Sequence, residues 1–215
     1  MEHRQLERST VHSLFPTLVW EARLARKAYL PLNDAILRRL VALRRGAPDP
    51  PVGAGWQSSV ALHRHEELAP LVTAIDRLAQ GVLEFLHIGE CEAPRLTGCW
   101  ANMNAPGAAH RMHAHPNNFL SGAYYVQVPE GADTINFHDP RPQAAVLRPP
   151  VTELAAQNTD QVVVRVAAGT LLLFPAWLAH SVDPNASGET RVSVSFNLMF
   201  PRFAETLAQP LWGQD

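Results

Sequence analysis

The sequence predicts a mainly β fold, a sandwich or barrel of short strands with flanking α-helices. After about residue 95, short apolar and β-branched runs recur and are separated by turns rich in Pro, Gly and Asn, which is typical of all-β domains. Before that point, two stretches carry apolar residues at helical spacing. We therefore expect residues 1–215 to form a single domain, with a helix-rich N-terminal part at 1–95 and a β core at 96–203.

The N-terminal part is expected to hold one strand and two helices. The strand is predicted at 15–24, the helices at 33–45 and 68–88, and a Pro/Gly-rich loop at 46–56. Asn33 or Asp34 is the expected N-cap of the first helix, and Gly46 its end. Apolar residues of the second helix recur every three or four positions. We expect both helices to cover the β core.

The β core is expected to contain at least five strand segments. They are predicted at 95–104, 120–128, 133–139, 161–175 and 190–200. In the last segment polar and apolar residues alternate, so that Arg191, Ser193 and Ser195 share one face of the strand. If that face lines the interior of the barrel, the interior contains an arginine, which binds carboxylates through two hydrogen bonds.

A cluster of histidines is the strongest chemical signal. Three of the ten histidines lie within six positions, at His110, His113 and His115. In an extended strand His113 and His115 project to the same side, and Pro116 favours that conformation in the residue before it. His110 is then expected on the other face or on a loop. His180, which follows an apolar strand, is the best candidate for a third metal ligand.

Composition and charge exclude several classes of partner. The formal net charge is −2 and no run of Lys or Arg occurs, so we expect no nucleic acid to bind. No apolar stretch approaches the ~18 residues of a membrane-spanning helix, and the charged N-terminus lacks the apolar stretch of a signal peptide. We expect a cytoplasmic protein without a membrane partner; the sequence does not indicate its oligomeric state.

Several motifs together resemble a known family. They are "GWQS" at 55–58, "HAHPNNFLSGAYYV" at 113–126, "FHDPR" at 137–141, and "GTLLLFPAWLAHSVDPN" with "RVSVSFN" between 169 and 197. In this order they resemble a bacterial and phage subfamily of non-haem 2-oxoglutarate/Fe(II)-dependent oxygenases. The resemblance implies a double-stranded β-helix, the jelly roll also found in cupins. It further implies Fe(II) as cofactor, 2-oxoglutarate as cosubstrate, and O₂-dependent hydroxylation of a small-molecule or peptide substrate.

The resemblance also assigns residues to the site. It implies metal ligands at His113, His115 and His180 and cosubstrate contacts at Arg191 and Ser193. Strand spacing adds two expected cosubstrate contacts: Tyr125, on the face shared by Ser121 and Ala123, and Asn102, two positions from Asn104. No catalytic residue is expected beyond the metal ligands. Most of the wider family has Asp or Glu where this chain has His115, so the implied set is three histidines. The alternative is that His115 supports the site and Asp139 or a water is the ligand.

Two other functions remain open from the sequence. A cupin-type dioxygenase also uses three histidines and needs no 2-oxoglutarate, in which case Arg191 would bind the carboxylate of the substrate itself. A non-catalytic jelly-roll binding module would carry the same fold without using the metal site, since fold alone does not determine function.

Overall fold

The structure is a computed structural model that describes residues 8–89, 92–141 and 149–202. Its helices, in chain order among the strands, are α1 (Arg26–Leu43) and α2 (Ala69–Phe85), with short 3-10 turns at Leu62–Arg64 and Glu66–Leu68. Its strands are β1 (Trp20–Arg23), β2 (Gly55–Gln57), β3 (Arg95–Asn104), β4 (His110–His113), β5 (Leu120–Gln127), β6 (Thr134–His138), β7 (Gln161–Arg165), β8 (Thr170–Pro175), β9 (His180–Val182) and β10 (Arg191–Met199). No helix of the described residues is long and apolar enough to cross a membrane.

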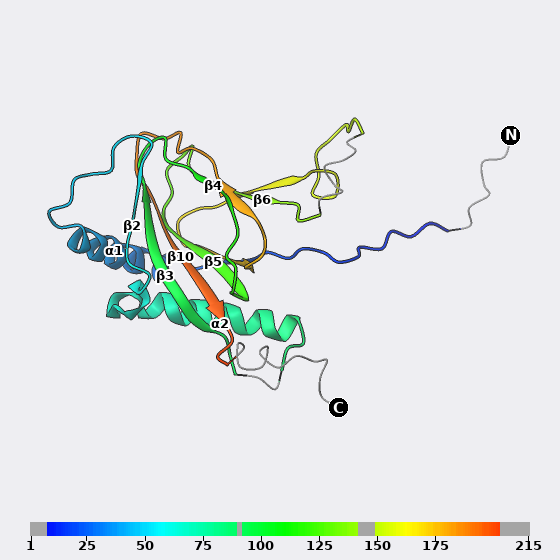
Figure 1. The fold of residues 1–215 in the computed structure, drawn as a ribbon, viewed down its shortest axis with the longest axis horizontal. Coiled ribbons are helices and arrows are strands. Elements are labelled where there is room, and N and C mark those ends of the chain that lie inside the picture. Colours follow the sequence, from blue (N-terminus) through cyan, green and yellow to red (C-terminus); the bar gives the residue numbers. More distant parts are fainter. Residues whose placement is uncertain (1–7, 90–91, 142–148, 203–215) are drawn as a thin grey trace, which may run out of the picture.

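The strands form two antiparallel sheets that pack face to face as a jelly roll (Figure 1). Within the described residues the larger sheet has the order β1-β8-β5-β10-β3-β2, and the smaller one β4-β9-β6-β7. Buried side chains of both sheets meet between them, including Tyr125 and Phe174 from the larger sheet and Ile135 and Phe137 from the smaller. The predicted mainly β class with flanking helices is therefore confirmed.

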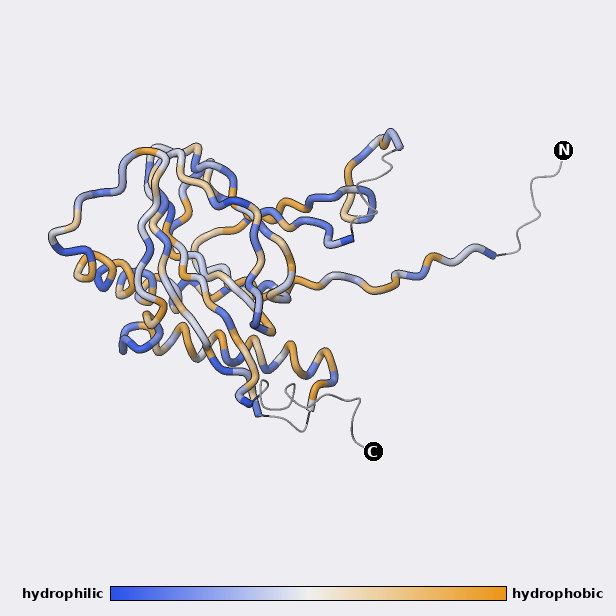
Figure 2. The backbone as a smooth tube through the Cα atoms, in the orientation of Figure 1, coloured by the Kyte–Doolittle hydropathy of each residue, from blue (hydrophilic) through white to orange (hydrophobic). Residues whose placement is uncertain are grey.

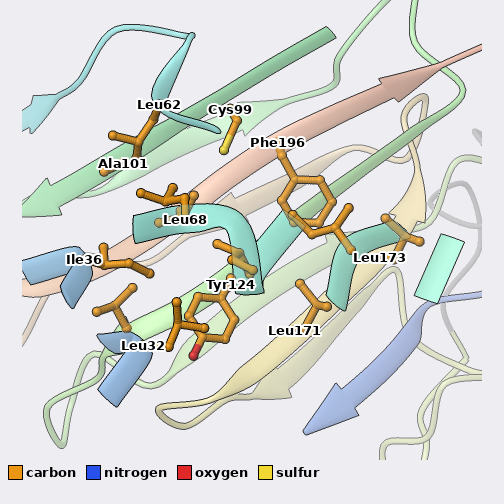
Figure 3. Packing of buried hydrophobic residues seen from close by; sticks show 14 of the residues in the cluster. Leu32, Ile36, Leu62, Leu68, Cys99, Ala101, Tyr124, Leu171, Leu173 and Phe196 are labelled. Carbon is orange, nitrogen blue, oxygen red and sulfur yellow. The ribbon is translucent and has the colours of Figure 1, made fainter. Parts of the chain in front are cut away.

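Both helices cover the outer face of the larger sheet, as predicted (Figure 1). Hydrophobic and hydrophilic stretches alternate along each helix (Figure 2), which gives each one a single apolar side. Figure 3 shows Leu32 and Ile36 of α1 beside Tyr124 of β5, within a cluster that also contains Phe196 of β10. The helices thus cover the outer face of the larger sheet, and its inner face is available to form a site.

The first helix begins seven residues earlier than predicted, and Asn33 is not its N-cap. Helix α1 starts at Arg26 and continues through Pro31. Asn33 is buried and faces the sheet, where its amide nitrogen donates to the Val126 carbonyl at 2.7 Å and its oxygen accepts from the Tyr124 hydroxyl at 2.6 Å. A buried asparagine is stable only with such partners, and they lie 91 and 93 positions away in the sequence.

The predicted positions of the strands agree with the structure better than their predicted ends do. The prediction for 95–104 coincides with β3, whereas the N-terminal strand is restricted to Trp20–Arg23. The run predicted as one strand at 161–175 is two strands in different sheets, because Gly169 turns the chain with a φ of +86°. Strand β2, at Gly55–Gln57, begins inside the stretch predicted as loop and pairs with β3.

Gly122 on β5 is closely packed, with no room for a side chain. A Cβ atom built there would lie 2.5 Å from the Leu172 carbonyl oxygen and also overlap the Phe196 ring. We expect Gly122→Ala to lower the unfolding free energy by about 2–3 kcal/mol through overpacking. Gly81→Ala on α2, where nothing lies within 4 Å, should instead raise it by about 0.5–1 kcal/mol. Urea unfolding of both variants measures the difference; equal effects would contradict the packing described.

Candidate metal centre

A polar row crosses the inner face of the larger sheet, as the alternation in β10 predicted. Arg191, Ser193 and Ser195 line a cavity of about 70 Å³ between the two sheets, while the residues between them, Val192 and Val194, lie in the core behind. Strand pairing places each polar residue of β10 opposite a β3 residue that lines the same cavity: Arg191 opposite Asn104, Ser193 opposite Asn102, and Ser195 opposite Trp100.

The structure brings His113, His115 and His180 together at one wall of this cavity. One ring nitrogen of each lies within 4.8 Å of the others, and imidazole nitrogens are common metal ligands. His113 and His180 are paired residues of β4 and β9. His115 lies beyond the end of β4, and its backbone N–H donates to the Ala176 carbonyl at 2.9 Å. Its ring stacks on that of His180 with centroids 5.2 Å apart.

Backbone carbonyls orient two of these imidazoles. Nδ1 of His113 lies 2.7 Å from the Arg111 carbonyl oxygen, and Nδ1 of His180 lies 3.0 Å from that of Leu178. Because a carbonyl only accepts, Nδ1 carries the hydrogen in both rings and Nε2 keeps its lone pair. Hydrogen bonds of this kind fix metal-ligating histidines in the tautomer that a metal needs. The local backbone therefore prepares two nitrogens as ligands.

Asp139, the alternative ligand, lies outside the histidine cluster and is already paired. Both carboxylate oxygens accept from Arg141, at 2.9 Å from Nε and 2.7 Å from Nη2. The Arg141 side chain holds the pKa of the Asp139 carboxyl below its usual range. Among the described residues, the group of ligand-type side chains close enough to share an ion contains three histidines and no carboxylate.

Arg191 is buried in the cavity wall and only 4% exposed. Its Nε has no hydrogen-bond partner, and its guanidinium carbon lies 5.2 Å from the centre of the Tyr125 ring. Within residues 8–89, 92–141 and 149–202 it forms no ion pair with an acidic side chain. Burial raises the pKa of the Tyr125 phenol although Arg191 acts in the opposite direction, so Tyr125 keeps its proton. A buried cation without an anion indicates a missing anionic ligand.

Asn102 lines the cavity, as its spacing to Asn104 predicted, but its side-chain amide is already hydrogen-bonded to other side chains. Its oxygen accepts from Gln57 Nε2 at 2.7 Å, and its nitrogen donates to Ser195 Oγ at 2.9 Å. Gln57, which lines the cavity from β2, was not predicted as a site residue. The motif "GWQS" was the signal for it. Ser193 lines the cavity between these groups and Arg191.

His110 faces the cavity, whereas the simple strand period places it away from His113. The pairing of β4 with β9 shifts register between these two residues, and such a bulge returns a side chain to the same side. His110 Nε2 lies within 3.2 Å of the Asn104 side-chain amide. Burial, with Arg191 and His113 nearby, lowers the pKa of His110 to about 4. His110 is thus a neutral member of the site.

The lowered pKa of His110 has a measurable effect on stability. Below pH 6.5 the unfolded chain takes up a proton at this residue that the folded chain does not take up until about pH 4. Stability therefore falls as pH drops through this window, by about 3 kcal/mol for this residue. We expect metal-free wild type to lose that much more unfolding free energy between pH 7 and pH 4 than His110→Gln. Urea titrations at both pH values check this; parallel losses in the two proteins would contradict it.

Comparisons with known proteins agree with this fold. Residues 98–197 match the model of the family described as "Putative 2OG-Fe(II) oxygenase". No curated protein matches the chain. Among solved structures, a prolyl-4-hydroxylase of Pseudomonas putida is 18% identical with a TM-score of 0.55, covering 86% of this chain and 94% of that one.

Two further structures share the fold. A Trichoplax adhaerens prolyl hydroxylase, in complex with a hypoxia inducible factor peptide fragment, is 12% identical with a TM-score of 0.62 and covers 89% of this chain and 87% of its own. HygX of Streptomyces hygroscopicus, with nickel, 2-oxoglutarate and hygromycin B bound, is 13% identical with a TM-score of 0.59, covering 87% and 84%. The family model thus matches the jelly-roll core of this chain, and the solved structures share its fold.

Proposed function

We propose that this protein holds Fe(II) with His113, His115 and His180, binds 2-oxoglutarate through Arg191, and hydroxylates a small-molecule or peptide substrate. One observation carries the proposal: a buried arginine with no acidic partner among the described residues lines the same cavity as three clustered imidazoles. A metal and a dicarboxylate together satisfy both groups.

The chain's residues have separable tasks in this site. Arg191 donates to the distal carboxylate of 2-oxoglutarate, and Tyr125 and Ser193, which line the same cavity, carry hydroxyls that are further donors. Asn102 keeps Gln57 and Ser195 in place and contributes to the polar wall through them. Iron with bound 2-oxoglutarate supplies the oxidation: O₂ is reduced while the keto acid loses CO₂ to give succinate and the substrate C–H bond becomes C–OH.

Apolar side chains close the rest of the cavity. Ile135, Phe174 and Val182 line it beside the histidines, and the Phe174 ring lies 4.8 Å from that of His180. A wall of this kind excludes water and strengthens the attraction between Arg191 and a bound carboxylate. Three neutral imidazoles leave the full 2+ charge on a bound iron, which favours the dianionic cosubstrate.

Measurements of metal binding, 2-oxoglutarate binding and succinate formation on anaerobically prepared protein test the proposal. Calorimetric titration is expected to show one Fe(II) per chain and then one 2-oxoglutarate that binds only when metal is present. On exposure to O₂, succinate is expected to form slowly even without substrate, and His180→Ala should abolish both metal binding and succinate. O₂ consumption that is independent of 2-oxoglutarate would favour a cupin-type dioxygenase, and absence of metal binding would favour a non-catalytic module.

The substrate and the location of the protein belong to the same proposal. The fold is shared by the Trichoplax structure with a peptide fragment and by HygX with hygromycin B, so the fold does not choose between a peptide and a small molecule. A cytoplasmic location stays a prediction from the sequence.

A further inference from the structure

An open cleft adjoins the metal cavity on the side of β2 and β4. Its volume is about 550 Å³, within the range of small-molecule sites, and it is largely open to solvent. Gln57, Asn104, His110 and His113 line both spaces. The cleft therefore opens next to a candidate metal ligand, where a substrate must lie to be oxidised.

The wall of this cleft is more polar than the wall of a typical small-molecule site. Besides the four shared polar residues, it is formed by Gly55, Ala109 and Arg111. Its lining residues include no Phe, Tyr, Trp or large aliphatic residue, so the cleft offers little apolar surface on which a hydrophobic substrate would pack. No described residue that lines either the cleft or the cavity is acidic. A positively charged substrate would find no counter-charge there.

Arg111 is the charged residue of the cleft wall. It lies on β4 between His110 and His113, and its exposed side chain forms no ion pair with a described acidic residue. Only its backbone is engaged, as the acceptor for Nδ1 of His113. The two functions of the residue are thus separate: a side-chain substitution changes the charge of the cleft and leaves the bond that orients His113.

The glycine at the base of the cleft keeps the polar wall accessible. A Cβ atom at Gly55 would lie 3.2 Å from Asn104 Oδ1 and 3.5 Å from the Met103 carbonyl. The absence of a side chain there leaves room beside Asn104 and His110, which bond to each other. Arg111 and the polar residues of the wall therefore line one shared space.

We propose that this cleft binds the primary substrate, and that the substrate is a small, hydrophilic molecule whose carboxylate or phosphate group pairs with Arg111. The inference rests on the proposed function for the identity of the adjoining cavity, but the binding of the anion does not depend on turnover. Arg191 holds the cosubstrate inside the cavity, and Arg111 selects the substrate at its mouth. Guanidinium binds either anion through paired hydrogen bonds.

The test measures binding with small probes by saturation-transfer NMR, on protein loaded with Ni(II) and 2-oxoglutarate and on metal-free protein. The probes are N-acetylglycine and glycerol 3-phosphate, their neutral counterparts N-acetylglycinamide and glycerol, and the cation choline. Each is used at about 10 mM, since fragments of this size bind with roughly millimolar affinity. We expect at least one anion to bind, and the neutral and cationic probes to give no signal. The anion that binds more tightly identifies the substrate group as carboxylate or phosphate.

Variants of Arg111 decide whether the cleft is responsible. Arg111→Gln is expected to weaken the anion by about tenfold or more, and Arg111→Glu to transfer binding to choline. Arg23→Glu, an exposed strand arginine at the opposite edge of the larger sheet, should leave binding unchanged. Affinity for 2-oxoglutarate should stay within about twofold in Arg111→Gln.

Three outcomes would overturn the inference: binding of choline or the neutral probes to wild type in preference to the anions, no anion signal, or anion binding that Arg111→Gln leaves unchanged. A loss of 2-oxoglutarate affinity in Arg111→Gln as large as in Arg191→Ala would overturn it too, because the cleft would then bind the cosubstrate. Failure of wild type to bind 2-oxoglutarate, with anion binding at Arg111 intact in metal-free protein, would instead contradict the proposed function alone.

Discussion

His115→Ala is expected to abolish tight iron binding and 2-oxoglutarate turnover, whereas Asp139→Ala leaves both near wild type. Substitution of an outer partner of a metal ligand typically costs 10–100-fold in metal affinity, so loss of a ligand should cost more than about 100-fold. His115 lies with His113 and His180 in one cluster, and the Asp139 carboxylate is already occupied by Arg141. Bound Fe(II) per chain, measured after anaerobic loading and gel filtration, checks both variants.

His115→Asp distinguishes a ligand from a packing residue at the same position. An aspartate supplies one oxygen and lowers the site charge by one, but it is shorter than imidazole and His115 lies past the end of β4. We expect it to retain iron with reduced affinity and to regain part of the succinate formation that His115→Ala lacks. Iron kept by His115→Ala and lost by Asp139→Ala would show that the carboxylate is the true ligand.

Arg191→Ala is expected to weaken 2-oxoglutarate binding by about 100-fold, equivalent to roughly 3 kcal/mol, with iron affinity unchanged. The reason is that the distal carboxylate loses a buried guanidinium that has no other anionic partner among the described residues. Calorimetric titration of the Ni(II)-loaded variant with 2-oxoglutarate measures the change.

The stability of metal-free Arg191→Ala is the matched control. A structural salt bridge would make the variant several kcal/mol less stable, because breaking a buried pair leaves an uncompensated charge. Arg191 has an unsatisfied Nε and contacts the Tyr125 ring, so we expect a loss of no more than about 1 kcal/mol. Strong destabilisation with normal 2-oxoglutarate affinity would assign Arg191 to the fold.

Periodicity and residue order predicted the parts of the site that depend on regular strands. The alternation in β10 placed Arg191 and Ser193 on the inner face, and the structure has them there. The order of His113, His180 and Arg191 predicted that they meet, because β4, β9 and β10 follow the jelly-roll connections that the family resemblance implied. Such predictions need only the two-residue repeat of a β-strand and the connections between strands that the resemblance implies.

Irregular backbone defeated the same reasoning. The register shift between β4 and β9 brings His110 into the cavity. No pattern of residues in the sequence indicated this shift. Asn33 was predicted as a helix cap from its neighbours in the sequence alone, yet its hydrogen-bond partners Tyr124 and Val126 lie on β5. Gln57 follows a Pro/Gly-rich stretch, so its short strand was hidden until pairing with β3 revealed it. Each error has a long-range contact as its cause.

A crystal structure of the anaerobic protein with Fe(II) and 2-oxoglutarate tests the central claim most directly. The account predicts iron bound by one nitrogen each of His113, His115 and His180, with Nδ1 of His113 still on the Arg111 carbonyl. It also predicts the distal carboxylate of 2-oxoglutarate on the Arg191 guanidinium. Iron held by Asp139 in place of His115, or a 2-oxoglutarate whose distal carboxylate lies away from Arg191, would contradict it.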